Sequence, residues 1–305
     1  MTEKFDYVVV GAGALGSSAA YWLTRAGERS VLVLEQFEIG HNRGASEDHS
    51  RIIRHAYHSP VYTALTPAAY ETWAQVEDES GLSLVTTTGG LDLAIAGTAG
   101  EAELDNYRNA LDHARIGYDN LTADNVRDRW PQWQVGDDTV GMWQRDGGIL
   151  DVRRACAVHL ALARARGAVV RPHTAVHGIR SSDAGVMLAT DAGEISAGYV
   201  VLCTASWLPD LLPDLGLTWN ITLSQEQVCY FATSNLRDFA PDRFPMWIWH
   251  GEPLFYGFPV YGEVAVKAAR DMTGRFVTQQ TRSFEPDPAE TTLVADFLRR
   301  RIPGA

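Results

Sequence analysis

A glycine-rich turn near the N-terminus constrains the fold of this chain more than any other feature. Residues 7–10 form an apolar β-type run, residues 14–26 have a helical pattern that ends at Gly27, and residues 31–34 form a second apolar run. The turn between the first run and the helix has the pattern GxGxxG. This order of strand, glycine-rich turn, helix and strand predicts a unit that binds a dinucleotide.

Each glycine of the turn has a separate physical role. Gly11 permits the tight turn, Gly13 lets a pyrophosphate approach the backbone, and Gly16 lets the helix pack closely on the strand. Ala14 opens the helix, whose first N–H groups and positive dipole end favour an anion. Glu35 ends the second run, where a carboxylate can accept hydrogen bonds from a ribose. These five candidate residues leave FAD and NAD equally open.

Length and charge limit the kind of partner. A chain of 305 residues with 46% hydrophobic residues can bury a large core and is expected to form two domains. With 38 acidic against 26 basic residues, the chain lacks the positive charge that nucleic acid or an anionic membrane surface would attract. No apolar run is long enough for a membrane span, and the first residues do not resemble a secretory signal. We therefore expect a cytoplasmic protein with a small-molecule partner.

Cysteine and histidine spacing predicts neither disulfides nor a metal site. The three cysteines, Cys156, Cys203 and Cys229, are widely spaced, so we interpret them as reduced thiols. His173 and His177 fall in an expected strand, where four residues span about 13 Å, too far for two imidazoles to share one ion. The histidines between residues 41 and 58 lack accompanying ligands at suitable spacing, so we interpret them as surface or ribose-adjacent residues.

The rest of the chain alternates between helical and β patterns. Expected helices cover 60–79, 100–114, 151–166 and 288–301, with a short one capped by Thr122. Expected strands cover 86–97, 168–171, 174–179 and 199–203, followed by a β-rich region over 221–268. The pattern is that of an α/β chain whose second half returns to the first sheet.

The stretch SRIIRHAY places two arginines in a chain of net charge -12. Arg51 and Arg54 flank two isoleucines, and Ala56 follows, so the stretch is expected to be at least half buried. A guanidinium fork can form two parallel hydrogen bonds to a carboxylate. The stretch therefore favours an anion site, although two solvated arginines on a loop are the simpler alternative.

Several motifs taken in order resemble one family. GAGALG, Glu35, SRIIRHAY, RWPQW, GGILD, LFYGFPVYGEVAVKAARD and FLRRRIPGA follow the order found in monomeric sarcosine oxidases and N-methyltryptophan oxidases, which are FAD-dependent amine oxidases of the D-amino-acid-oxidase superfamily. The resemblance runs along the whole chain. It implies an α/β fold with a Rossmann-like FAD-binding domain over 1–84 and 151–218, and a β-rich substrate domain over 85–150 and 219–305.

The resemblance also implies an activity and its residues. Such an enzyme oxidises a secondary amine, such as an N-methyl amino acid, passing a hydride to the flavin and then electrons to dioxygen, which leaves as hydrogen peroxide. The partners are thus a small amine and dioxygen, and the protein is expected to be a monomer. By resemblance, Arg54 binds the substrate carboxylate, Arg51 lies by the flavin ring, Lys267 activates oxygen, and Tyr256 lines the substrate pocket.

Three departures from the family pattern bear on these expectations. Asp271 stands where sarcosine oxidases carry a histidine, which puts sarcosine itself in doubt. Ala205 and Ser206 replace a glycine and alanine beside the FAD. FLRRRIPGA precedes, in the family, the cysteine that joins the flavin covalently, so we expect a C-terminally truncated chain with non-covalent FAD. Two alternatives are an impaired remnant that binds only part of FAD, and an NAD-dependent dehydrogenase, which explains the β-α-β unit alone.

Overall fold

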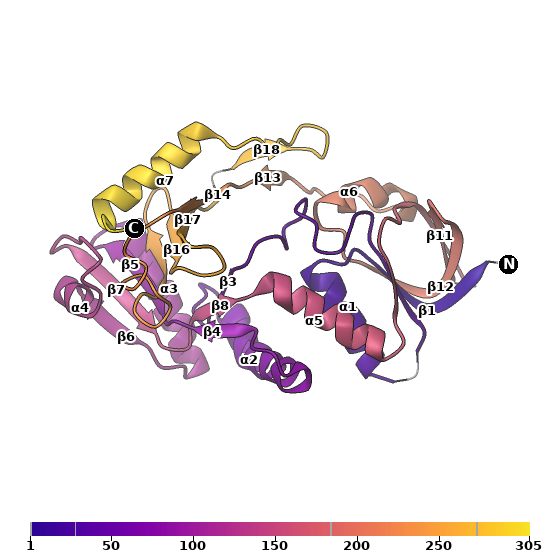
Figure 1. Cartoon of the computed structure of the whole chain (residues 1–305), viewed down its shortest axis with the longest axis horizontal. Helices are drawn as coiled ribbons and strands as arrows, with labels where there is room; N and C mark the ends of the chain where they lie inside the picture. Colours follow the sequence, from indigo (N-terminus) through magenta and orange to yellow (C-terminus); the bar gives the residue numbers. More distant parts are fainter. Residues whose placement is uncertain (1, 28, 184, 273) are drawn as a thin grey trace. The chain divides into compact units, whose positions relative to one another are not determined.

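The computed structural model describes residues 2–27, 29–183, 185–272 and 274–305. The chain forms two compact units, each built from two separate segments (Figure 1). Unit 1 comprises Met1–Asp48 and Val152–Leu223, and unit 2 comprises His49–Asp151 and Ser224–Ala305. This mixed α/β architecture confirms the predicted fold class.

Unit 1 is built on a six-stranded sheet with the order β10-β11-β12-β1-β2-β9. Its strands are β1 (Glu3–Val10), β2 (Val31–Leu34), β9 (Val169–Arg171), β10 (Val176–Ser182), β11 (Gly185–Thr190) and β12 (Gly193–Leu202). Strand β1 runs parallel to both β2 and β12, and β2 runs parallel to β9. Strands β10, β11 and β12 are successive antiparallel neighbours. The later segment of unit 1 therefore returns to the first sheet, as predicted.

Both faces of this sheet are covered. Figure 1 shows helices α1 (Ala14–Arg25) and α5 (Val152–Ala165), which contact each other. Their apolar sides pack with Val9 and Val33 on one face of the sheet. Because side chains alternate along a strand, Val8 faces the other way and packs with residues of β11 and β12. Short helical turns η1 (Ala205–Trp207), α6 (Leu208–Leu211) and η2 (Pro213–Leu215) follow β12.

Unit 2 is built on a seven-stranded sheet with the order β14-β17-β16-β15-β5-β7-β6. Its strands are β5 (Gly90–Ile95), β6 (Asp119–Thr122), β7 (Thr139–Gln144), β14 (Val228–Phe231), β15 (Met246–His250), β16 (Phe255–Phe258) and β17 (Val266–Arg270). Smaller pairings join β3 (Arg51–Ile53), β8 (Gly148–Leu150) and β4 (Val85–Thr87), and separately β13 (Leu223–Gln225) and β18 (Arg275–Val277). The strand content confirms the β-rich second part.

An aromatic core lies against one face of the large sheet. Helices α4 (Ala123–Arg129) and α7 (Pro288–Arg301) contribute to it, and Phe297 of α7 stacks on Phe255 with ring centroids 4.2 Å apart. Helices α2 (Pro60–Ser80) and α3 (Ala99–Ala114) pack together, and α3 contacts β5, β7 and β15. Thr122 caps α4 through a reciprocal capping box with Asn125, as its position predicted.

Two boundaries differ from the predicted ones. Residues 49–84 were expected with the nucleotide-binding part, but they belong to unit 2, because β3 pairs with β8 and the Tyr70 hydroxyl donates to the Asp146 carbonyl at 2.7 Å. The expected strand at 174–179 begins at Val176, and His173 lies before it with a φ of 52°.

Within the described residues, no helix is both long and apolar enough to span a membrane.

Candidate functional site

The glycine-rich turn of unit 1 is closed so tightly that side chains would not fit. Gly11 has a φ of +98°, and a Cβ atom there would lie 2.5 Å from the Cys203 carbonyl oxygen. A Cβ on Gly16 would lie 1.7 Å from the Gly11 carbonyl oxygen, and one on Gly13 would lie 3.0 Å from the Ser46 hydroxyl oxygen. The turn therefore holds the first residues of α1 against the end of β1, as the motif predicted. Gly16 lies beneath the turn and does not line the cavity in front of it.

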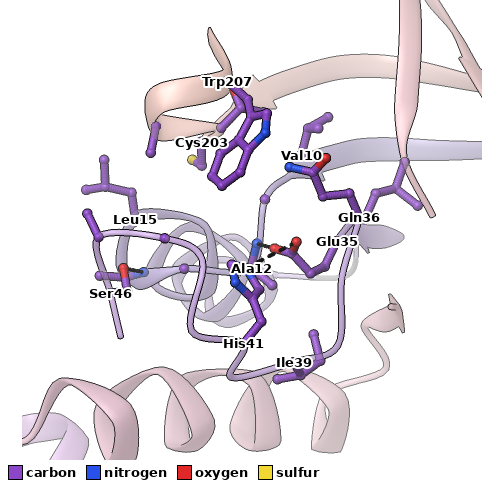
Figure 2. A pocket seen from close by; sticks show the side chains of 18 of the residues that line it. Val10, Ala12, Leu15, Glu35, Gln36, Ile39, His41, Ser46, Cys203 and Trp207 are labelled. Atoms are coloured by element: carbon purple, nitrogen blue, oxygen red, sulfur yellow. Dashed lines mark hydrogen bonds and ion pairs between the residues drawn. The ribbon is translucent and has the colours of Figure 1, made fainter. Parts of the chain in front are cut away.

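The N-terminus of α1 faces a loop that was not predicted to take part. The Ala14 N–H donates to the Ser46 hydroxyl at 2.9 Å, and Leu15 beside it is 77% exposed (Figure 2). Ser46 belongs to the segment between β2 and unit 2, which crosses in front of the helix. Backbone N–H groups at a helix N-terminus attract anions such as a pyrophosphate. The Ser46 hydroxyl satisfies the Ala14 N–H, which is one of the donors that such an anion would use.

Glu35 is buried at the end of β2 and is held by backbone donors. One carboxylate oxygen accepts from the Ala12 N–H at 2.9 Å, and the other accepts from the Phe37 N–H at 3.1 Å. His41 Nε2 lies 3.4 Å from the second oxygen. His41 Nδ1 accepts from the Arg43 N–H at 3.0 Å, so the proton of a neutral ring is on Nε2 and faces Glu35. These contacts fix the Glu35 carboxylate at the end of β2, which is the position that the sequence pattern predicted.

A cavity of about 950 Å³ opens in front of these groups. Figure 2 shows Trp207 facing the space that Glu35 and His41 border. Residues from the loop 36–47, from α5, from 174–177 around the start of β10 and from the segment after β12 complete the wall. The volume is at the upper end of the range for ligand pockets, which suits a large cofactor. Among the lining residues, the sequence pattern had indicated Gly11, Gly13, Ala14 and Glu35 and had missed Ser46 and Trp207. His41 had been interpreted only as one of several surface or ribose-adjacent histidines.

Ala205 lines the same cavity in a conformation that favours glycine. Its φ is 45°, which is the left-handed region, and the family pattern has a glycine at this position. An L-residue with a Cβ costs about 1 kcal/mol more than glycine in that region. The departure noted in the sequence therefore stores modest backbone strain at the cavity wall.

A second cluster lies in unit 2 around Ser50. Lys267, on β17, is 3% exposed, and its Nζ donates to the Ser50 carbonyl at 3.1 Å and lies 3.2 Å from the Ser50 hydroxyl. Arg51 Nη1 donates to the same carbonyl at 2.7 Å. The Lys267 ammonium also lies 4.7 Å from the centre of the Phe258 ring. Ser50 thus brings the predicted residues Arg51 and Lys267 together, and the solvent-facing alternative for Lys267 is wrong.

Arg54 lies in a mostly buried, aromatic environment. Its guanidinium carbon is 4.9 Å from the centre of the Tyr57 ring and 5.3 Å from that of Tyr107, and the side chain is 16% exposed. Burial alone would lower the pKa of Arg54, but Tyr107 and Asp92 raise it above its usual value. Burial raises the pKa of Tyr107 to about 12. The guanidinium therefore remains charged, and the solvated-loop alternative is wrong for Arg54.

Tyr256 and Asp271 have less decisive surroundings. Tyr256, on β16, is half buried, and its ring centroid is 6.2 Å from that of Phe258. Asp271 follows β17 and is exposed, with its N–H bonded to the Leu254 carbonyl at 3.1 Å.

Within the described part of the chain, no set of three or more histidine, cysteine, aspartate or glutamate side chains is arranged to hold a metal ion.

Comparison with known proteins agrees with these features. The family described as FAD dependent oxidoreductase matches residues 6–305. A monomeric sarcosine oxidase from Streptomyces avermitilis is 30% identical, with 99% of this chain and 79% of that protein covered. An N-methyl-L-tryptophan oxidase from Escherichia coli is 28% identical, with 99% and 80% covered. The solved open form of NikD, described as an unusual amino acid oxidase essential for nikkomycin biosynthesis, has a TM-score of 0.89 at 26% identity, with 99% and 79% covered.

This chain belongs to the FAD-dependent oxidoreductase family, and within it to the enzymes similar to sarcosine and N-methyltryptophan oxidases. Membership decides between the two dinucleotides that the turn alone left open, in favour of FAD. The cavity of unit 1 fits that group, since Gly13 leaves room beside Ser46 where a Cβ would be crowded, and Glu35 lies at the wall.

Proposed function

We propose that this chain oxidises a secondary amine that carries a carboxylate, such as an N-methyl amino acid, with FAD and dioxygen. The products would be hydrogen peroxide and an imine, which water hydrolyses to an aldehyde or keto compound and the shorter amine. The observation that supports this most is a charged, largely buried Arg54 in the same unit as a buried Lys267. The similar sarcosine oxidase and N-methyl-L-tryptophan oxidase support N-methyl amino acids as the substrate class. The similar sarcosine oxidase is monomeric, which supports a monomer here.

The residues of unit 1 would hold the nucleotide part of FAD. The turn at Gly11 and Gly13 and the first N–H groups of α1 would receive the pyrophosphate, and Ser46 would help to place it. Glu35 would accept hydrogen bonds from the ribose. A bound FAD would supply the two-electron redox chemistry between the carbon beside the substrate nitrogen and dioxygen.

The residues of unit 2 would supply charge. Arg54 would receive the substrate carboxylate through its guanidinium and so orient the amine. Lys267, held by Ser50, would stabilise negative charge as it develops on dioxygen. Arg51, which shares the Ser50 carbonyl with Lys267, would lie by the flavin ring, and Tyr256 would line the substrate pocket. The carboxylate side chain at Asp271 weighs against sarcosine as the preferred amine, so the proposal names the class of substrate and no single member.

Arg54→Ala should weaken binding of amines that carry a carboxylate by about 10- to 100-fold, because a hydrogen bond to a charged group contributes about 1.5 to 3 kcal/mol. N-methylphenylalanine and N-methylphenethylamine differ only in the carboxylate and form a suitable pair. Their dissociation constants would be obtained by anaerobic stopped-flow, from the dependence on ligand concentration of the absorbance change that precedes flavin reduction. Arg299→Ala, at a 73% exposed side chain, is the control. Equal losses for both ligands would show that Arg54 is structural.

We also propose that FAD is bound without a covalent link to this chain. Cys156 and Cys203 line the cavity of unit 1, and burial raises the pKa of the Cys203 thiol, which disfavours the nucleophilic thiolate. Cys229 is buried in the aromatic core of unit 2. Acid precipitation of the FAD-loaded protein should therefore give a colourless pellet and a yellow supernatant. A pellet that keeps the flavin after repeated washing in denaturant contradicts the proposal.

A further inference from the structure

A buried carboxylate lies beside Arg54 without hydrogen-bonding to it. Asp92, on β5, is 1% exposed, and its Oδ1 is 3.9 Å from Arg54 Nη1. That separation is too long for a hydrogen bond, but two opposite charges at this distance in a protein interior still attract strongly. Arg54 Nη1 is itself buried and has no hydrogen-bond partner among the described residues. Asp92 thus balances the charge of Arg54 without occupying its donors.

The sheet explains why Asp92 keeps this position. Leu91 and Leu93 pack into the aromatic core, so Asp92 between them faces the opposite side of β5. Strand β15 runs parallel to β5 with Ile248 opposite Asp92, which brings His250 two residues further along to the same side. His250 Nε2 bonds to Asp92 Oδ1 at 2.8 Å.

The same arrangement has aromatic walls. Tyr107 of α3 meets the His250 ring edge to face at 5.1 Å, and its ring also lies beside the Arg54 guanidinium. Asp92 is therefore held by His250 on one side and is shielded from water. A charge that is fixed and shielded in this way acts on any charged ligand that reaches Arg54.

We propose that Asp92 is a specificity-determining residue that makes the Arg54 site select zwitterions and reject plain carboxylates. This inference rests on the proposed function, in which Arg54 receives a carboxylate. The Arg54–Asp92 pair, with a neutral His250 beside it, has no net charge, so a plain carboxylate would bring an uncompensated negative charge into a low-dielectric site. An amino acid with a positively charged nitrogen adds no net charge to the site. Its cation is attracted by Asp92, and this attraction offsets the repulsion between Asp92 and the carboxylate.

Glycine betaine and 3,3-dimethylbutanoate provide a matched test, because they have the same shape and differ only in a quaternary nitrogen or carbon. Neither has an amine that can be oxidised, so binding is measured by calorimetry on the FAD-loaded protein. Asp92→Asn should raise the affinity for 3,3-dimethylbutanoate by about tenfold or more, since it removes a repulsive charge. The affinity for glycine betaine should change less than about threefold, because two opposite effects offset each other. Asp92→Glu keeps the charge and should keep the wild-type preference.

The outcomes distinguish the selection by Asp92 from the carboxylate site at Arg54 on which it rests. Equal changes for both ligands, or weaker binding of 3,3-dimethylbutanoate, would overturn the selection by Asp92 while leaving the carboxylate site at Arg54 intact. Failure of the wild-type protein to bind either ligand would overturn both. If Asp92→Asn does not fold, the wild-type protein decides alone. Tighter binding of the more hydrophobic 3,3-dimethylbutanoate than of glycine betaine would then contradict the proposal.

Discussion

Lys267→Met should slow the reaction of reduced flavin with dioxygen by about 10²- to 10³-fold, the range seen when one fixed stabilising group is lost from a buried site. Lys267 is 3% exposed and Ser50 holds its Nζ, so under the proposed function the group is already in position when negative charge forms on dioxygen. Methionine has a similar length and no charge. Reduction of the flavin by the amine should change by less than about tenfold, because that step develops no negative charge on dioxygen.

The measurement would be stopped-flow absorbance with anaerobically reduced protein mixed with dissolved oxygen. The chain has only one other lysine, Lys4, which is exposed, so Lys4→Met is a matched control. Equal slowing of the reductive and oxidative steps would assign Lys267 a structural role. An unchanged oxidative rate would exclude it from oxygen activation.

Gly16→Ala should weaken FAD binding by up to about 100-fold. The added Cβ would lie 1.7 Å from the Gly11 carbonyl oxygen, which is backbone and cannot rotate away. Overpacking of this kind typically costs up to about 3 kcal/mol, which corresponds to about 100-fold in affinity if the turn opens. Fluorescence titration of the apoprotein with FAD would measure the change.

Gly117→Ala is the control for this substitution, because a Cβ at Gly117 would meet nothing within 4 Å. Its affinity for FAD should match that of the wild-type protein. If Gly16→Ala also binds FAD with wild-type affinity, α1 does not need its close approach to β1, and the role given to the turn is wrong.

The parts of the fold that could be predicted are those determined by interactions between residues close together in the sequence. The turn at Gly11, the helix behind it and Glu35 follow from short-range sterics and periodicity, and the structure places all of them as expected. The capping box at Thr122 is local in the same sense. The resemblance to a family added Arg54 and Lys267, whose burial the structure shows and whose roles stay proposals.

What could not be predicted depends on contacts between distant segments. Ser46, from a loop, and Trp207, from the short turn η1, line the cavity without any sequence pattern that would have predicted it. Residues 49–84 belong to unit 2 because their strand β3 pairs with β8, which lies far along the chain. Asp92 lies within an apolar strand. Its proposed role depends on its hydrogen bond with His250 and its distance to Arg54, neither of which the sequence predicts.

The central claim is that this chain passes electrons from an N-methyl amino acid through FAD to dioxygen, and anaerobic mixing tests it most directly. The FAD-loaded protein would be mixed with a panel of N-methyl amino acids without oxygen while the absorbance of oxidised flavin is followed. We expect at least one of them to bleach the flavin, and readmission of oxygen to restore the colour with one hydrogen peroxide formed per flavin. A flavin that stays bound and oxidised with every member of the panel would contradict the account.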